Sequence, residues 1–302
     1  MPPGGLLLDV LIPGLLLGSL YALFALGQSL MFGVMRLTNT AQGDFIVLGA
    51  FAATSLVAPL APVPGGLAAV ALALLVLLPL AFGTGYLLQR QVLNTTLASG
   101  AASDPLPSLV VTFGLAIVIQ NGLLQLYSAD PRSIDVGALA TQAIALGDER
   151  SVGALPLLIA AVALAATAGL QWLFGRTALG RAFRAVSDDR EIAETMGLDA
   201  RHIYALATAI AFALIALAGV LQAMRTTVAP SDGPLLLLFA FEAVIIGGMG
   251  SFWGTWCGAL LLGVTQQIGF RIDPGWGIWL GHIAFLAVLL VRPQGLFPKT
   301  RG

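Results

Sequence analysis

Two residues of this chain, Ser251 and His282, are the one pair that could act together as a nucleophile and a base. A hydrolase would also need a strained G-x-S-x-G turn around the serine and donors for an oxyanion, and the sequence has neither pattern. We therefore interpret His282 as a histidine that packs or lines a pore. Nucleotide hydrolysis is excluded as well, because the only lysine is Lys299 and no G-x-x-x-x-G-K-[ST] segment is present. The sequence predicts no catalytic site, cofactor site or metal site.

The charge of the chain is concentrated in one segment, residues 175–202, which holds five of the fourteen basic residues and five of the fifteen acidic ones. Asp188 and Glu191 have the spacing of a capping box, and Gly197 stands where a helix C′ residue belongs. A short helix is therefore predicted from about Asp189 to Met196. We expect this segment to meet a soluble partner, because a segment that only fixed the orientation of the chain would not need acidic residues and helix caps.

The faces of the segment fit such a docking role. A preceding amphipathic helix is predicted over Leu179 to Val186, and Arg190 and Glu194 have the spacing of an ion pair along the second helix. The alternative is a solvated loop that serves only to orient the chain. The residues expected to couple to the partner are Gly180, Arg181, Arg184, Asp189, Arg190, Glu191, Glu194 and Gly197.

The composition of the whole chain defines its class. Hydrophobic residues make up 58% and charged residues 10% of the 302 residues, and the mean hydropathy is +0.94. A soluble protein carries about a quarter charged residues, so a multi-pass membrane protein is predicted. The single cysteine, Cys257, lies in an apolar stretch and is interpreted as a small packing residue.

Nine apolar stretches predict an all-α transmembrane helical bundle with eight or nine crossings and broken helices. The whole chain, 1–302, is expected to form one domain, because the polar segments are too short to build a core of their own. Breaks rich in Pro and Gly are expected at 59–66, 104–107 and 247–254. The stretches are 10–34, 43–60, 66–89, 107–127, 153–174, 203–225, 235–249, 253–270 and 277–291.

The basic residues predict the orientation of the bundle. With nine crossings and an external N-terminus, most of them gather on one side, which the positive-inside rule makes cytoplasmic, and two arginines of the 128–152 loop lie opposite, outnumbered by acidic residues. The cytoplasmic side holds Arg36, Arg90, the five arginines from Arg176 to Arg201, Arg292, Lys299 and Arg301, whereas the opposite side holds Asp9, Asp130, Asp135, Asp148 and Glu149. No cleavable signal peptide is expected, because the first basic residue is Arg36.

Several blocks carry a resemblance to a known family. In chain order these are the block FGVMRLTNTAQGDF at 32–45, the segment Thr177 to Asp199, the block IGGMGS at 246–251 and the ending RPQGLF at 292–297. Together they resemble the permease subunits of the branched-chain amino acid ABC transporter family, and most closely the smaller, H-type subunit. Gln42 stands where that family more often has His, and Glu242 where it often has Lys.

The resemblance implies a function and its partners. It implies a bacterial inner-membrane permease of an ATP-driven importer, with two ATPase subunits that push on the cytoplasmic coupling loop, 175–202. A second, M-type permease subunit and an external binding protein would complete the system, although pairing with a second copy of this chain is also open. Leucine, isoleucine or valine is the expected cargo, with urea, short amides or other small amino acids as alternatives. An ion-coupled secondary transporter is the alternative class, and no nucleic-acid partner is expected.

Polar residues near two glycine-rich breaks are the candidates for the transport path. An ionisable group at membrane depth is costly, by about 3 kcal/mol, and normally faces an internal cavity. Asp44 is therefore expected either to line the path or, at the membrane surface, to cap a helix. The sequence around the first break, at 43–50, is weakly similar to that around the second, at 250–259, as in an internal repeat. Transporters commonly bind their substrate between such repeats. The candidate path residues are Asn39, Gln42, Asp44, Gly247, Gly248, Gly250 and Ser251.

Overall fold

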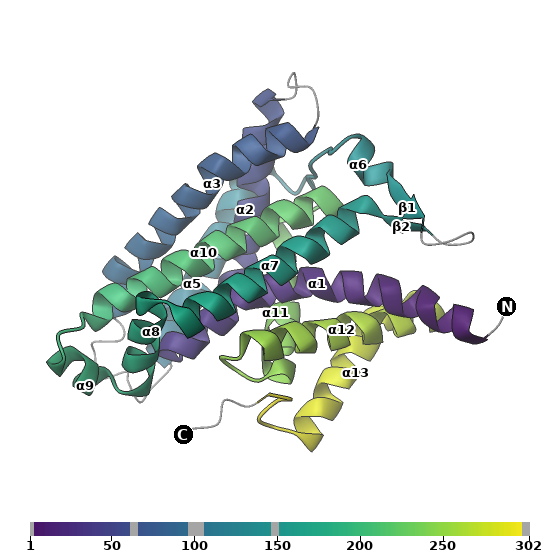
Figure 1. Ribbon diagram of the computed structural model, residues 1–302. Helices are drawn as coiled ribbons and strands as arrows, with labels where there is room; N and C mark the ends of the chain where they lie inside the picture. Colours follow the sequence, from purple (N-terminus) through teal and green to yellow (C-terminus); the bar gives the residue numbers. More distant parts are fainter. Residues whose placement is uncertain (1–2, 61–65, 96–105, 146–150, 298–302) are drawn as a thin grey trace.

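The computed structural model describes residues 3–60, 66–95, 106–145 and 151–297. Parts of the predicted breaks at 59–66 and 104–107 lie outside these ranges, as do Asp148, Glu149, Lys299 and Arg301. Each predicted apolar stretch corresponds to a helix (Figure 1). These helices are α1 (Pro3–Met35), α2 (Gln42–Val57), α3 (Gly66–Leu88), α5 (Leu106–Tyr127), α7 (Ala154–Arg176), α10 (Ala200–Arg225), α11 (Gly233–Gly247), α12 (Phe252–Ile272) and α13 (Trp276–Val291).

The shorter elements lie at the two ends of the bundle (Figure 1). At one end are α8 (Ala178–Asp188) and α9 (Arg190–Thr195). At the other end are α6 (Ala138–Thr141) and an antiparallel hairpin of β1 (Ala143–Ala145) and β2 (Ser151–Gly153), in which Ile144 pairs with Val152. Sequence analysis did not predict this hairpin. Single turns lie at Ala58–Leu60, at Pro230–Asp232 and, as a π-helical turn, at Gln89–Leu93.

Six spans of the described chain are long and apolar enough to cross a membrane, one of them formed by the turn at 230–232 together with α11, and α2 and α13 are apolar but shorter. The predicted all-α, multi-pass bundle is confirmed, and the number of crossings stays a prediction. The core is formed by α1 and α10, while α3 and α5 lie outside and expose large apolar side chains such as Leu75, Val110 and Leu126. In a membrane protein such side chains face lipid or a partner subunit.

Close packing in the core depends on small residues. A Cβ atom on Gly18 of α1 would overlap the backbone of α12 at Ala259, and one on Gly219 of α10 would overlap the carbonyl oxygen of Ile46 on α2. Helices in a membrane gain little from the hydrophobic effect, so van der Waals contact between closely approaching backbones takes its place. These glycines therefore set the distances between α1, α2, α10 and α12.

Candidate functional site

The polar residues at the boundary of the first two apolar stretches, Asn39, Gln42 and Asp44, lie inside the bundle. After α1 ends at Met35, the chain reverses and runs back along the same helix. The side chain of Gln42 donates a hydrogen bond to the carbonyl oxygen of Phe24, and the backbone N–H of Asn39 lies 3.4 Å from Oε1 of Gln28. Phe24 precedes Met35 by about 16 Å of helix. The next helix, α2, therefore begins deep in the bundle.

Residues 36–41, the re-entrant segment between α1 and α2, are held by hydrogen bonds on both sides. Asn39, which is fully buried, accepts a 3.0 Å hydrogen bond at Oδ1 from the N–H of Ala41. Thr40 donates from its backbone N–H to Oγ1 of Thr112 on α5 at 3.2 Å, and the two hydroxyls lie 2.8 Å apart. The segment is thus fixed between α1 and α5.

Asp44 lies in the first turn of α2 and is 4% exposed. Its carboxylate rests against Gly233, the first residue of α11, so closely that a Cβ atom there would overlap Oδ1. Because the first turns of two helices carry partial positive charge from their free N–H groups, a carboxylate between them is stabilised. Asp44 is therefore buried between α2 and α11, and its role in a transport path stays a prediction.

The helix α11 also begins inside the bundle. From the end of α10 the chain returns through Val228, which pairs with Arg132, and through a turn in which Asp232 Oδ2 accepts a 2.8 Å hydrogen bond from the N–H of Ala229. The helices α2 and α11 are 16 and 15 residues long, or about 24 and 22 Å, against about 30 Å for the apolar core of a membrane. Each is a half-helix that starts at the Asp44–Gly233 contact.

The two half-helices point to opposite ends of the bundle. The far end of α2 lies beside the end of α5, where Ser55 and Tyr127 place their hydroxyls 2.9 Å apart. The far end of α11 lies beside the end of α1, because the next residues place Gly250 against Gly33. The stretch predicted at 235–249 locates α11 to within two residues at each end, but the position of its start inside the bundle was not expected from sequence.

That second break joins α11 to α12. Gly248 and Gly250 have φ values of 101° and 83°, a region that favours glycine. Ser251 caps α12 by accepting a 3.1 Å hydrogen bond from the N–H of Gly254. The predicted path residues therefore fall into two groups at opposite ends of α11. Asn39, Gln42 and Asp44 form one, and Gly247, Gly248, Gly250 and Ser251 form the other.

A segment after α13 completes the end of α11. The N–H of Leu296 donates to the carbonyl oxygen of Ile246 at 2.8 Å, and that of Phe297 donates to Gly247 at 3.0 Å. Gly295, with φ of 81°, packs against Gly248. The last carbonyl groups of a helix lack partners within it, so this segment supplies them for α11.

Sequence analysis missed a buried polar cluster between α1, α11, α12 and α13. Glu242 is 2% exposed, and its Oε1 lies 2.6 Å from Nδ1 of His282. In the same cluster, Tyr21 on α1 donates a 2.7 Å hydrogen bond to Oε1 of Gln266 on α12. Among the described residues, Glu242 Oε2 and Gln266 Nε2 have no hydrogen-bond partner. An ionisable residue inside one apolar stretch and a histidine inside another were the available signal, but nothing in the sequence paired them.

The charged segment forms two short helices, as predicted, but the cap of the first was not predicted and that of the second needs one correction. Thr177 caps α8 by accepting a 3.0 Å hydrogen bond from the N–H of Gly180, and Asp189 caps α9 by accepting one of 3.0 Å from Ile192. The predicted capping box at Asp188 is wrong by one residue, because α8 continues through Asp188. Gly197, with φ of 88°, ends α9 as predicted.

The first of these helices is fixed to the bundle. Phe183 and Val186 on α8 are buried, and Gly180 leaves no room for a Cβ atom against Phe174 of α7. Arg184 donates to the carbonyl oxygen of Phe174. Ser187 donates a 2.8 Å hydrogen bond to the carbonyl oxygen of Gly33, near the end of α1. The same residue of α1 therefore contacts both α8 and the Gly250 break.

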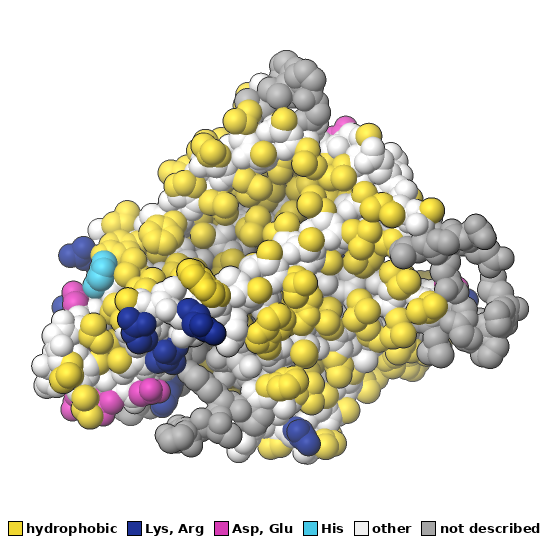
Figure 2. Space-filling view, viewed as in Figure 1, with side chains coloured by type: hydrophobic (Ala, Val, Ile, Leu, Met, Phe, Trp, Pro, Cys, Tyr) yellow, Lys and Arg dark blue, Asp and Glu magenta, His cyan; other side chains and the backbone are white. Residues whose placement is uncertain are grey.

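The second helix, α9, presents an outward face. Ile192 and Met196 are 61% and 80% exposed, and the predicted pair of Arg190 and Glu194 is present, with Nε and Oε1 2.9 Å apart. Figure 2 shows basic and acidic side chains gathered at the end of the molecule that holds α8 and α9, whereas the rest of this face is mostly apolar. This end offers a mixed apolar and charged surface on a fixed support.

Comparison with known proteins shows the family to which the sequence is similar. A family model described as "Branched-chain amino acid transport system / permease component" matches residues 10–291. The high-affinity branched-chain amino acid transport system permease protein BraD of Pseudomonas aeruginosa is 32% identical over 306 residues, which cover 97% of this chain and 96% of BraD. LivH of Escherichia coli is 25% identical over 294 residues, which cover 95% of this chain and 94% of LivH.

Similarity to the second type of permease is shorter. LivM of Escherichia coli is 34% identical over 128 residues, which cover 42% of this chain and 30% of LivM. No solved structure matches the chain. The resemblance to the H-type subunit is thus supported along nearly the whole length, and the chain belongs to the family of branched-chain amino acid transport permease components.

Proposed function

We propose that this permease carries leucine, isoleucine, valine or a related small amino acid inward across a bacterial inner membrane, driven by two ATPase subunits. The observation that carries the proposal is the pair α8 and α9, which is capped, fixed to α1 and α7, and exposed at Ile192 and Met196. The cargo follows from the names of BraD and LivH, which are called branched-chain amino acid permeases. A second, M-type permease and an external binding protein complete the proposed system.

The proposed topology has nine crossings, with an external N-terminus and α8 and α9 in the cytoplasm. The half-helices α2 and α11 then each reach from the middle of the membrane to one face. Arg36, Arg90 and the arginines of 176–201 lie on the cytoplasmic side, as the positive-inside rule requires.

The proposed coupling runs through α1. An ATPase that docks on α9 and moves α8 also moves Gly33, because Ser187 is hydrogen-bonded to its carbonyl oxygen. Gly33 lies against Gly250, so the displacement reaches the break between α11 and α12. The glycines at this break permit a change of backbone angles, so Gly247, Gly248, Gly250 and Ser251 act in the proposal as a hinge.

The proposed substrate route passes beside the start of α2 and α11. Asn39, Gln42 and Asp44 lie there at membrane depth, and the free N–H groups of two helix ends converge on the same place. Such ends can bind the carboxylate of an amino acid, and a carboxylate such as that of Asp44 can pair with its ammonium group. In this proposal the tilt of α11 exposes these groups to the interface with the second permease.

The docking proposal is tested by two substitutions on α9. Glu191→Lys reverses a charge in its first turn, and Gly197→Val strains the positive φ at its end. Both variants should reach the membrane but uncouple ATP hydrolysis from uptake, measured as amino acid transported per ATP hydrolysed in proteoliposomes. Ser128, exposed on another face, provides a control as Ser128→Gly. Normal uptake per ATP in both α9 variants would contradict the docking proposal.

A further inference from the structure

The end of α3 is built differently from the other helix ends. Its last residues form a π-helical turn, Gln89–Leu93, and π-helical turns are frequent at functional sites. Gln89 is fully buried. It accepts a 2.8 Å hydrogen bond from Thr208 on α10 and donates one of 3.1 Å to Asn94. Asn94 in turn donates to the carbonyl oxygen of Arg201 at 3.2 Å. Three side chains therefore hold the turn rigidly on the start of α10.

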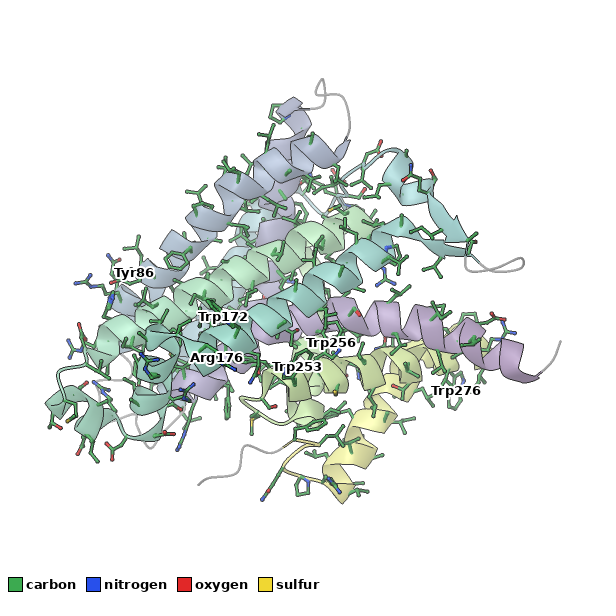
Figure 3. All side chains as sticks on the ribbon, viewed as in Figure 1. Tyr86, Trp172, Arg176, Trp253, Trp256 and Trp276 are labelled. Atoms are coloured by element: carbon green, nitrogen blue, oxygen red, sulfur yellow. The ribbon has the colours of Figure 1, made fainter. Side chains whose placement is uncertain are left out.

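A cavity of about 370 Å³ lies beside this turn. Its polar lining includes Tyr86 and Arg90 from α3 and its π-helical turn, and Arg201 and His202 from α10. The hydroxyl of Tyr86 lies 2.8 Å from Nδ1 of His202 and accepts a 3.4 Å hydrogen bond from Nη1 of Arg90. The cavity thus lies at the surface, and three of the side chains that line it contact one another. Figure 3 labels Tyr86 at the outer edge of the bundle.

The charge of the cavity is positive. The ion pairs found among the described residues are Arg190–Glu194 and Glu242–His282, so neither Arg90 nor Arg201 is paired with an acid there. Asp199 also lines the cavity, but its Oδ1 is engaged at the start of α10, where it accepts from the N–H groups of Arg201 and His202 at 3.0 and 3.2 Å. Two guanidinium groups against one carboxylate leave an excess of positive charge, and guanidinium groups suit the geometry of phosphate.

The position of the cavity suits a lipid headgroup. It opens at the end of α3, an outer helix that exposes Leu75, Leu80 and Leu87 along its length. In a membrane those leucines face acyl chains or a partner subunit. Arg201 and His202 follow α9 directly in the chain, so the cavity lies at the same end of the bundle as α8 and α9. Basic pockets at that level between membrane helices bind anionic headgroups.

We propose that this cavity binds the phosphate group of an anionic molecule, held by Arg90 and Arg201, and that a phospholipid headgroup supplies it in preference to free phosphate. The inference rests on the proposed function only for its sidedness, which makes the leaflet the cytoplasmic one. The network through Thr208, Gln89 and Asn94 positions the two arginines, and Tyr86 with His202 closes one wall. A bound lipid joins α3 to α10 next to the helices that dock the ATPase.

The proposal is tested by native mass spectrometry of the assembled transporter, incubated with equal amounts of phosphatidylglycerol and phosphatidylcholine. The parent should retain phosphatidylglycerol in preference. Arg90→Gln combined with Arg201→Gln should bind it about tenfold more weakly, because each arginine near a membrane surface contributes a several-fold attraction. The matched control combines Arg176→Gln with Arg292→Gln, which removes two exposed charges outside the cavity and should behave like the parent.

Adding inorganic phosphate distinguishes a phospholipid headgroup from free phosphate as the source of the bound phosphate group. If phosphate displaces phosphatidylglycerol from the parent, the phosphate group is the part that is recognised in the lipid. If phosphate raises the melting temperature of the parent but not of the Arg90 and Arg201 double variant, while lipid retention is equal in both, the source is free phosphate. Equal lipid retention and equal response to phosphate in parent and double variant would overturn the proposal. None of these measurements depends on transport, so a failure of the proposed function would leave them unchanged.

Discussion

Gly43 and Gly233 are in backbone contact: a Cβ atom on Gly43 would overlap the carbonyl oxygen of Gly233 and crowd the N–H of Leu237. This contact lets the first turns of α2 and α11 cross deep in the bundle, beside Asp44. No side-chain rearrangement could relieve an added methyl group there, because both neighbours are backbone atoms.

Gly43→Ala should therefore destabilise the protein by about 3 kcal/mol, the upper range for overpacking a core. The control is Gly83→Ala on α3, where a Cβ atom would meet nothing within 4 Å. That change should be neutral or stabilise by about 0.5 kcal/mol, as expected for glycine in a helix. Thermal unfolding of the two purified variants measures the difference, and equal melting temperatures would contradict the contact.

Asp44→Asn should leave assembly intact and change the rate of uptake or the preference among substrates. The amide keeps the size of the carboxylate but removes its charge, which is the part that a helix end or an ammonium group would attract. Gln42→Leu should behave similarly, with an added loss of its hydrogen bond to Phe24. Uptake of several labelled amino acids, normalised to assembled transporter, is the measurement. If both variants matched the parent for every substrate, the route would lie elsewhere.

Glu242 and His282 should be coupled energetically. His282→Ala leaves the buried carboxylate without its 2.6 Å partner and should cost about 2 kcal/mol, the range for an unsatisfied buried group. Because Glu242→Leu removes the group that His282 satisfies, the double variant should be more stable than the sum of the single effects predicts. Unfolding of the two single variants and the double variant gives the coupling, and strict additivity would show that the pair does not interact.

The proposed sidedness can be tested with single cysteines in a Cys257→Ser background. Met196→Cys on α9 should react with a membrane-impermeant thiol reagent only from the cytoplasmic side, and Ser133→Cys only from outside. Both native side chains are exposed in this chain, and membranes that hold the permease without its ATPases leave the docking surface at Met196 uncovered. Labelling of both positions from the same face would contradict the topology.

The helices were predictable because their signal is local. The stretch predicted at 153–174 is α7 at Ala154–Arg176, and that predicted at 203–225 is α10 at Ala200–Arg225. Continuous apolar composition and flanking turn residues are enough to place such helices. The caps of α9 were recognisable for the same reason, although the N-cap is Asp189 and not the predicted Asp188.

The meeting of distant residues was not predictable in this way. Asp44 contacts Gly233, and Glu242 contacts His282, through packing of helices that are separated by long stretches of chain. No local sequence pattern predicts which apolar faces of the helices pack against each other. The start of α11 was predicted within two residues, at 235, but the sequence did not show that this helix end lies inside the bundle against α2.

The segment that follows α13 has a consequence for biosynthesis. Leu296 and Phe297 supply the hydrogen-bond donors for the last carbonyl groups of α11, and Gly295 fills the space beside Gly248. During synthesis, α11 leaves the ribosome before α12 and α13, so its end waits without these partners while two further helices enter the membrane. The contact between residues 295–297 and the end of α11 therefore forms last. A chain interrupted after α13 would leave the break between α11 and α12 without these partners and open to the quality-control proteases of the cell.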